Sequence, residues 1–211
     1  MQHKPFIITI VGPESSGKTT LARELADFYE APWVPEFARK YLEGLGRPYH
    51  ENDLNHIAVG QLEAISEVLG RQFAGVSFQS AVGSLQSLVG NFHSSVGSFQ
   101  SPVGNSQSAV HNSRERTQKS FLAFQREEFG EEPRPLVIVD SGMLSLRMWA
   151  RIKYGITIPV VEEALKEDMT SLYLLTRPFS QWENDPLREA PVLLDRVWIY
   201  NHYLKELSSV R

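Results

Sequence analysis

A short glycine-rich segment near the start of the chain carries the clearest chemical signal. Residues 12–19 read GPESSGKT and satisfy the pattern GxxxxGK[ST]. They follow the apolar run FIITIV and precede an amphipathic segment, which is the strand-to-helix setting that this pattern requires. In that setting, backbone N–H groups and the positive end of the helix face one anion site. The segment therefore predicts binding of a nucleoside triphosphate together with Mg²⁺.

Each residue type in this loop has an expected role. Gly12 and Gly17 let the backbone turn inward, Lys18 can bridge the β- and γ-phosphates, and the Thr19 hydroxyl suits Mg²⁺. The residues expected to bind the nucleotide are Gly12, Pro13, Glu14, Ser15, Ser16, Gly17, Lys18, Thr19 and Thr20. A glycine-rich turn with a surface lysine is the alternative interpretation.

A carboxylate ends the apolar run LVIVD at residues 136–140. At the carboxyl end of a buried parallel strand, Asp140 would lie at the ligand edge of the sheet. We expect it to hold the Mg²⁺ shell, directly or through water. The alternative is a cap for the helix that follows, and Ser141 could fill that role as well.

Two further segments could handle a phosphoryl acceptor. In VPEFARKYLE, Glu36 could orient or deprotonate a hydroxyl, and Arg39 could neutralise phosphate charge or hold Glu36 in place. A surface i,i+3 ion pair is the alternative for these two residues. The stretch RPFSQWENDPLREAP has the composition of a mobile lid, from which Arg177 and Arg188 could close over the transferring phosphoryl group.

Composition sets the frame around these motifs. The 211 residues are 42% hydrophobic and 22% charged, as in an ordinary globular domain. A net charge of −4 gives no electrostatic reason to expect binding to nucleic acid or to a membrane surface. The run FIITIV is too short to span a membrane, and no signal-type cleavage region accompanies it. We expect a cytoplasmic protein without disulfides, since the chain has no cysteine.

The middle of the chain repeats itself every seven residues. Five successive units read AVGSLQS, LVGNFHS, SVGSFQS, PVGNSQS and AVHNSRE. Their Gly, Ser and Asn content disfavours a coiled coil, and each unit offers little apolar area to offset the entropy of ordering. We expect a flexible low-complexity insertion at about 72–117 that interrupts a single domain spanning 1–211. A partner-binding or strand-forming tract is the alternative, in which case a protein partner could order it.

The remaining sequence alternates strand and helix patterns. Strands are expected at 6–11, 33–34, 136–140 and 171–176, and helices at 19–29, from 37 onward, 52–69, 119–129, 144–154, 160–166 and 192–207. Strands separated by helices predict an α/β fold, with a parallel sheet covered on both faces.

Four sequence blocks, in order, resemble the NadR-type ribosylnicotinamide kinase domain and its P-loop ATPase relatives. They are GPESSGKTTLARELA, PEFARKYL, VD with a helix of the form LxxxxWxxxKYG, and WxxDPLRExP, within about 1–70 and 118–207. The resemblance implies a P-loop NTPase fold of the nucleoside-kinase-like type with four to five parallel strands. It also implies ATP-dependent phosphorylation of the 5′-hydroxyl of nicotinamide riboside, which yields nicotinamide mononucleotide in NAD salvage.

Carried over by position, the resemblance assigns roles to individual residues. Lys18, Glu36 and Arg188 would be catalytic, and Arg39 would face the acceptor beside Glu36. Asp140 would serve the metal, together with Thr19, or the nucleoside hydroxyls.

Two function classes remain open at this stage. The first is a small-molecule kinase, which the lid and the pair Glu36 and Arg39 favour. The second is a nucleotide-dependent regulatory ATPase or switch, which the repeat and the pair Ser141 and Gly142 favour, since the family often carries an acid there. The base of the acceptor also stays open, because Trp149, Tyr154 or Trp182 could stack on many rings.

Overall fold

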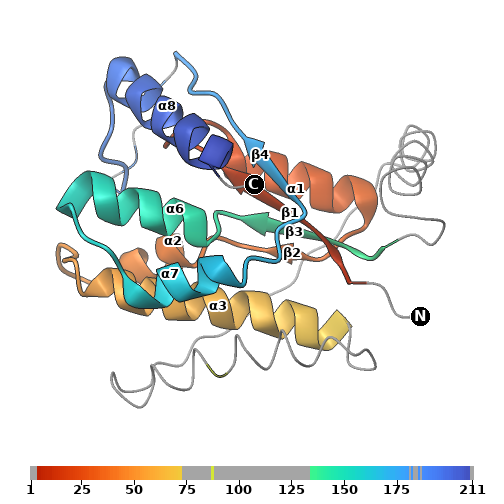
Figure 1. Ribbon diagram of the computed structural model, residues 1–211. Coiled ribbons are helices and arrows are strands. Elements are labelled where there is room, and N and C mark those ends of the chain that lie inside the picture. The colour runs from red at the N-terminus through yellow and green to blue at the C-terminus, as the bar shows by residue number, and fades with distance from the viewer. Residues whose placement is uncertain are drawn as a thin grey trace.

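Figure 1 shows the computed structural model of the chain, which describes residues 4–72, 87, 134–180, 182, 185 and 187–209. The strands are β1 (Phe6–Val11), β2 (Trp33–Val34), β3 (Leu136–Asp140) and β4 (Leu172–Leu175). The helices are α1 (Lys18–Tyr29), α2 (Phe37–Glu43), α3 (Asp53–Gln72), α6 (Met143–Trp149), η1 (Ala150–Tyr154), α7 (Pro159–Lys166) and α8 (Leu193–Ser209). Apart from residues 72 and 87, the predicted insertion at 72–117 lies outside the described residues, as does the predicted helix at 119–129.

The four strands form one parallel sheet in the order β2-β3-β1-β4. In β1, Phe6 pairs with Leu136 of β3, and Ile8 pairs with Leu172 of β4. All of β1 is buried, as expected for a central parallel strand made of a continuous apolar run. Because every strand points the same way, their carboxyl ends meet at one edge of the sheet. The predicted α/β fold with a parallel sheet is confirmed, with four strands in the part of the chain that the structure describes.

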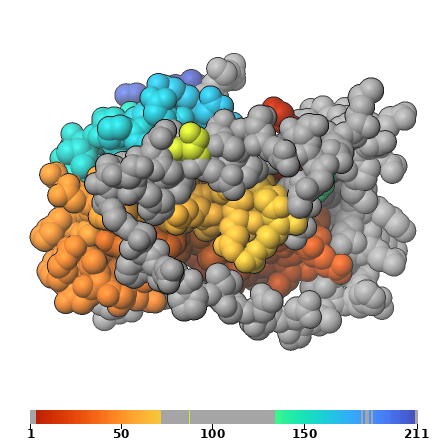
Figure 2. Space-filling view, turned by 90° about the horizontal axis from the view of Figure 1, so that it is seen from below, coloured from red at the N-terminus to blue at the C-terminus, as the bar shows by residue number. Residues whose placement is uncertain are grey.

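Successive residues of β1 face opposite sides of the sheet, so each side has its own core. Ile8 and Ile10 pack with Ala22 of α1 on one face, whereas Ile7 packs with Leu69 of α3 on the other. Helices α6 and α7 join α3 on that second face, and α8 packs against α6 (Figure 1). The view from below in Figure 2 shows α3 (gold) beside the orange segment that contains α2. The prediction of helices on both faces is confirmed.

The helix predicted at 144–154 is two elements rather than one. The α-helix α6 ends at Trp149 and continues as the π-helix η1, and Gly155 ends η1 at a φ of 66°. The wider π turn changes the direction in which side chains leave the helix, an effect that a 3.6-residue period does not reveal. Other helix bounds differ from the expected ones by one to three residues, as is usual for frayed ends. Among the described residues, no helix is long and apolar enough to cross a membrane.

Candidate functional site

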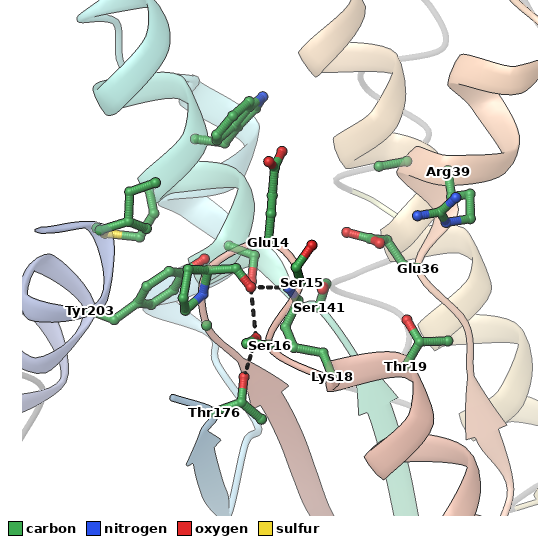
Figure 3. Close-up of a pocket in the computed structure, with 18 of the residues that line it drawn as sticks. Glu14, Ser15, Ser16, Lys18, Thr19, Glu36, Arg39, Ser141, Thr176 and Tyr203 are labelled. Carbon is green, nitrogen blue, oxygen red and sulfur yellow. Dashed lines mark hydrogen bonds between the residues drawn. The ribbon is translucent and has the colours of Figure 1, made fainter. Parts of the chain in front are cut away.

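The carboxyl edge of the sheet borders a cavity of about 920 Å³. The cavity is lined by the glycine-rich loop, by parts of α2, α3 and α6, and by the segment that follows β4. Several residues that the sequence predicts for the site line it: residues 12–20, Glu36, Arg39, Trp149, Arg177 and Arg188. Figure 3 shows the loop residues between Tyr203 on one side and Glu36 with Arg39 on the other. Segments far apart in the sequence therefore meet around one space.

The glycine-rich loop is shaped by close backbone contacts. Gly12 has a φ of 145°, and a Cβ at this position would lie 2.4 Å from Thr176 Oγ1 and 2.8 Å from Thr176 O. The Thr176 N–H donates to Val11 O at 2.9 Å, which fastens the end of β4 to the end of β1. Gly17 precedes α1 with a φ of 78°. Both glycines thus have the positive φ that side chains rarely adopt, and Gly12 also has no room for one.

Side chains inside the loop brace its curve. The Ser16 hydroxyl donates to Pro13 O at 2.7 Å and also bonds the Thr176 hydroxyl at 2.6 Å, as the dashed lines in Figure 3 indicate. The Lys18 ammonium donates to the same Pro13 carbonyl at 2.9 Å. That carbonyl oxygen stands where a phosphate oxygen could become the partner of Lys18, because both are acceptors for an ammonium donor. Lys18 is therefore positioned across the mouth of the loop.

The end of the predicted lid is fastened to the glycine-rich loop. Arg188 Nη1 donates to Ser15 Oγ at 2.9 Å. The Glu14 carboxylate accepts the backbone N–H groups of Glu189 and Ala190 at 2.8 and 2.9 Å. Burial raises the pKa of Glu14, although these two N–H donors oppose the shift. The Glu14 side chain, expected only as part of the nucleotide loop, therefore holds the lid segment.

Asp185 joins two of the three arginines that the sequence predicts for phosphate contacts, Arg39 and Arg188. Arg39 Nη2 donates to Asp185 Oδ2 at 2.9 Å, and Arg188 Nε lies 3.4 Å from the same oxygen. Arg39 also lies 3.9 Å from Glu43. Among the described residues, the carboxylates within ion-pair distance of Arg39 are Asp185 and Glu43, so Glu36 and Arg39 do not form the i,i+3 ion pair of the alternative interpretation.

Asp140 is a buried carboxylate without a hydrogen-bonding partner. Its side chain is 0% exposed, and neither oxygen accepts a hydrogen bond within the described part of the chain. Burial raises its pKa to about 6, while the hydroxyl of Thr19, which is nearby but not in hydrogen-bonding geometry, lowers the pKa. Such a group needs a cationic partner, since a buried, uncompensated carboxylate is costly. Asp140 does not itself line the cavity, whereas Thr19 does. A carboxylate beside a hydroxyl is nevertheless a donor set that suits Mg²⁺.

The alternative role of Asp140 or Ser141 as a helix cap is wrong. The residue that caps α6 is Gly142, and no side-chain hydrogen bond caps this helix. Ser141 instead adopts a φ of 58°, which turns the chain sharply between β3 and α6. Ser141 lines the cavity, and Figure 3 places it among the loop residues.

Another part of the cavity wall is aromatic. Tyr49 and Trp149 both line it, and the indole N–H of Trp149 donates to the Tyr49 hydroxyl at 2.7 Å. The Lys153 ammonium lies 3.7 Å from the centre of the Tyr49 ring and pairs with Glu189 at 2.5 Å. Tyr154 supports this cluster from behind through a 3.3 Å bond to the Tyr49 carbonyl. An aromatic ring of a ligand could therefore stack here.

The other aromatic residue considered for stacking lies elsewhere. Trp182 lies over the guanidinium of Arg196, with the Arg196 carbon 5.2 Å from the ring centre. Arg196, which is 1% exposed in α8, also donates to Phe179 O at 2.9 Å. The Phe179 ring lies 3.3 Å from the Cβ position of Gly17. This part of the lid thus packs between α8 and the phosphate loop.

A parallel sheet of order β2-β3-β1-β4, with a glycine-rich loop between the central strand β1 and helix α1, defines the P-loop NTPase fold. The comparisons with known proteins agree with this class. Residues 7–75, which run from β1 past the end of α3, match the model of a family described as an AAA domain. No curated protein matches the sequence.

Among solved structures, the chain is similar to one described as NadR protein in complex with NR. The TM-score is 0.55 at 18% sequence identity, and the alignment covers 98% of this chain and 43% of the NadR chain. The chain therefore spans less than half the length of the NadR structure that it matches. At this identity the likeness shows the fold, and both findings support the resemblance to NadR-like P-loop proteins that the sequence predicts.

Proposed function

We propose that the chain is an ATP-dependent kinase that phosphorylates a hydroxyl group of a small nucleoside, with the 5′-hydroxyl of nicotinamide riboside as the first acceptor to test. One observation carries this proposal: a single cavity joins the glycine-rich loop, the carboxylate of Glu36 and the aromatic pair Tyr49 and Trp149. A regulatory ATPase needs the loop alone, whereas a kinase also needs a base and a place for its acceptor.

At the donor end, cationic side chains surround the position of the transferring phosphoryl group. Lys18 would exchange its bond with Pro13 for one with a phosphate oxygen, and Arg188 would act from the lid beside Ser15. Thr19 and Asp140 would hold Mg²⁺, which would neutralise charge on the phosphates when bound. This arrangement stabilises negative charge without requiring a covalent intermediate on the protein.

At the acceptor end, Glu36 is the group that can take a proton. Its carboxylate lines the cavity and points toward the phosphate loop in Figure 3. It would accept the hydroxyl proton of the nucleoside while the hydroxyl oxygen bonds to the γ-phosphorus. The bond from that phosphorus to its bridging oxygen would break, and ADP would leave with the bond's electrons.

Tyr49 and Trp149 would receive the base of the nucleoside. Their shared hydrogen bond fixes both rings, so that little side-chain entropy is lost when a ligand stacks on them. The NadR structure was determined in complex with NR, which makes nicotinamide riboside the natural acceptor to try first.

The test is ATP consumption by the purified protein with Mg²⁺, measured without acceptor, with nicotinamide riboside and with a panel of other nucleosides. We expect one nucleoside to stimulate turnover and its monophosphate to form. ATP binding without any acceptor-stimulated turnover would contradict the kinase and favour the regulatory ATPase.

Glu36→Gln tests the assigned base. A glutamine keeps the size of the side chain but cannot take the proton, so we expect kcat to fall on the order of 100-fold with ATP affinity unchanged. The matched control is Glu43→Gln on the same helix, because the Glu43 side chain is 61% exposed and lies at the far end of α2. Equal loss of ATP binding and turnover in Glu36→Gln would remove Glu36 from the acceptor site.

A further inference from the structure

A buried glutamine of α3 contacts the backbone on both sides of Glu36. Gln61 is 2% exposed and belongs to the lining of the cavity. The Phe37 N–H donates to Gln61 Oε1 at 2.8 Å, and Gln61 Nε2 donates to Pro35 O at 3.4 Å. One amide group therefore bridges the residue before Glu36 and the residue after it.

These two partners also define how the amide is oriented. An N–H group can only donate and a carbonyl can only accept, so the Gln61 oxygen must face Phe37 and its nitrogen must face Pro35. The Gln61 amide is thus fixed by hydrogen bonds at both its oxygen and its nitrogen. These two bonds hold the buried side chain in one rotamer.

The hydrogen bond from Phe37 satisfies one of the N–H groups at the start of α2 that lack a partner within the helix. Glu36 occupies the N-cap position of α2 in an extended conformation, with φ of −64° and ψ of 113°, yet its side chain makes no capping hydrogen bond. Gln61 accepts the N–H of the first helical residue, Phe37. The Glu36 carboxylate is therefore not used by its own helix and can be directed into the cavity.

Gly60, the neighbour of Gln61, makes room for the same segment. A Cβ at Gly60 would lie 2.2 Å from Cε1 of the Phe37 ring, so this ring rests directly on the backbone of α3. The start of α2 is consequently seated on α3 by one close packing contact and by the two hydrogen bonds of Gln61.

We propose that Gln61 is a positioning residue for Glu36: it caps α2 from outside and fixes the backbone around the carboxylate that receives the acceptor's proton. The inference rests on the proposed role of Glu36. It predicts that loss of the Gln61 amide harms phosphoryl transfer to the nucleoside and leaves the handling of ATP intact.

The test uses Gln61→Met in the full chain, because methionine has a similar length and neither donates nor accepts at those positions. Acceptor turnover, KM for ATP and the melting temperature are measured together. We expect kcat/KM for the nucleoside to fall about 10- to 100-fold with KM for ATP within twofold of wild type. Ser66→Ala is the matched control, since Ser66 is a buried polar residue of the same helix that does not line the cavity.

A double-mutant cycle separates positioning from general damage. Because the effect of Gln61→Met passes through Glu36, it should change turnover less than twofold in a Glu36→Gln background. If the fold-losses of turnover in Gln61→Met and Glu36→Gln simply multiply in the double variant, the positioning role of Gln61 is overturned. Should Gln61→Met not fold, Gln61→Leu also removes the amide that contacts Phe37 and Pro35 and is subject to the same cycle.

The outcomes distinguish the two proposals. Absence of acceptor-stimulated turnover in the wild-type protein would reject the proposed function itself. Wild-type turnover in Glu36→Gln would reject the role of Glu36, and with it that of Gln61, and would leave the kinase in place. Slow turnover in Glu36→Gln combined with wild-type turnover in Gln61→Met would reject the role of Gln61 alone.

Discussion

The two ends of the cavity are built in different ways. At the donor end, Ser16 and Lys18 both donate to Pro13, a partner no more than five residues away in the sequence. At the acceptor end, the bond between Trp149 and Tyr49 joins residues 100 positions apart. Local backbone geometry thus shapes the loop at the donor end, which Thr176 and Arg188 anchor from distant segments, whereas this contact at the acceptor end depends on the packing of distant elements. Substitutions at the donor end should therefore impair ATP use with every acceptor, whereas those at the acceptor end should mainly change the acceptor.

Lys18→Ala should cause the largest loss of turnover and should impair only the donor end of the cavity. Losing one charge-assisted phosphate contact in a desolvated site costs on the order of 3 kcal/mol in the transition state, so turnover should fall by about 100-fold or more with any acceptor. Folding should be unaffected, because the ammonium makes a single bond to Pro13 in this structure. The control is Lys166→Ala, whose side chain is 67% exposed, and wild-type activity of Lys18→Ala would refute the role of the loop.

The same division explains what could be predicted from the sequence. The phosphate loop could be predicted because its pattern, its glycines and its flanking strand and helix are consecutive in the chain. The strands β1 and β3 could be predicted because buried parallel strands are short apolar runs. The π-helix η1 could not, because its residues carry no signal that separates a π turn from an α turn.

The residues missed at the site all act through distant partners. Tyr49 lies in a loop without sequence periodicity, and only its hydrogen bond with Trp149 places it at the site. Asp185 contributes to the site through its ion pair with Arg39, which is 146 residues away in the sequence. Gln61 occupies a polar position of an amphipathic helix, and the sequence does not show that α2 packs on it. Sequence patterns specify a local conformation, whereas these contacts depend on which elements the fold brings together.

Gly12→Ala should have the next largest effect, a loss of stability and of nucleotide affinity at the donor end. A methyl group would collide with Thr176, and a φ of 145° is strained for any side chain, so we expect unfolding free energy to drop by about 3 kcal/mol and nucleotide affinity to fall. The matched control is Gly155→Ala, where φ is 66° and no atom lies within 4 Å of the added Cβ. That variant should lose only about 1 kcal/mol. Equal losses in thermal or urea unfolding of the two variants would show that contact with Thr176 is unimportant.

Asp53→Asn should destabilise the loop that carries Tyr49. The Asp53 carboxylate accepts two bonds from Arg47 at 2.8 Å, one from the Tyr41 hydroxyl at 2.8 Å and one from the His50 N–H at 2.7 Å. The loss of these charge-assisted bonds should cost about 2 kcal/mol. The KM for the nucleoside should rise while the KM for ATP stays constant. Asp27→Asn, an exposed residue of α1, is the control.

The pH dependence of this stability has a defined sign. The Arg47 guanidinium holds the pKa of Asp53 well below its usual range. The carboxylate therefore stabilises the folded state fully above its ordinary pKa of about 4, and this contribution is lost as the pH falls toward the lowered folded pKa. The difference in melting temperature between wild type and Asp53→Asn should be constant from pH 8 to about 5 and should narrow below about pH 4. A difference that widens on acidification would contradict the assignment.

Tyr49→Phe should have the smallest effect and gives the sharpest test of the acceptor end. It removes the partner of the Trp149 indole N–H and keeps the aromatic ring, so the cost should be about 1 kcal/mol. If Tyr49 and Trp149 hold the base, KM for the nucleoside should rise roughly fivefold, and ATP hydrolysis without acceptor should not change. Tyr29→Phe is the control, because Tyr29 ends α1 away from the cavity. If ATP hydrolysis without acceptor changed as much as the KM for the nucleoside, the contact between Trp149 and Tyr49 would affect the phosphate loop too. The donor and acceptor ends of the cavity would then not be separate.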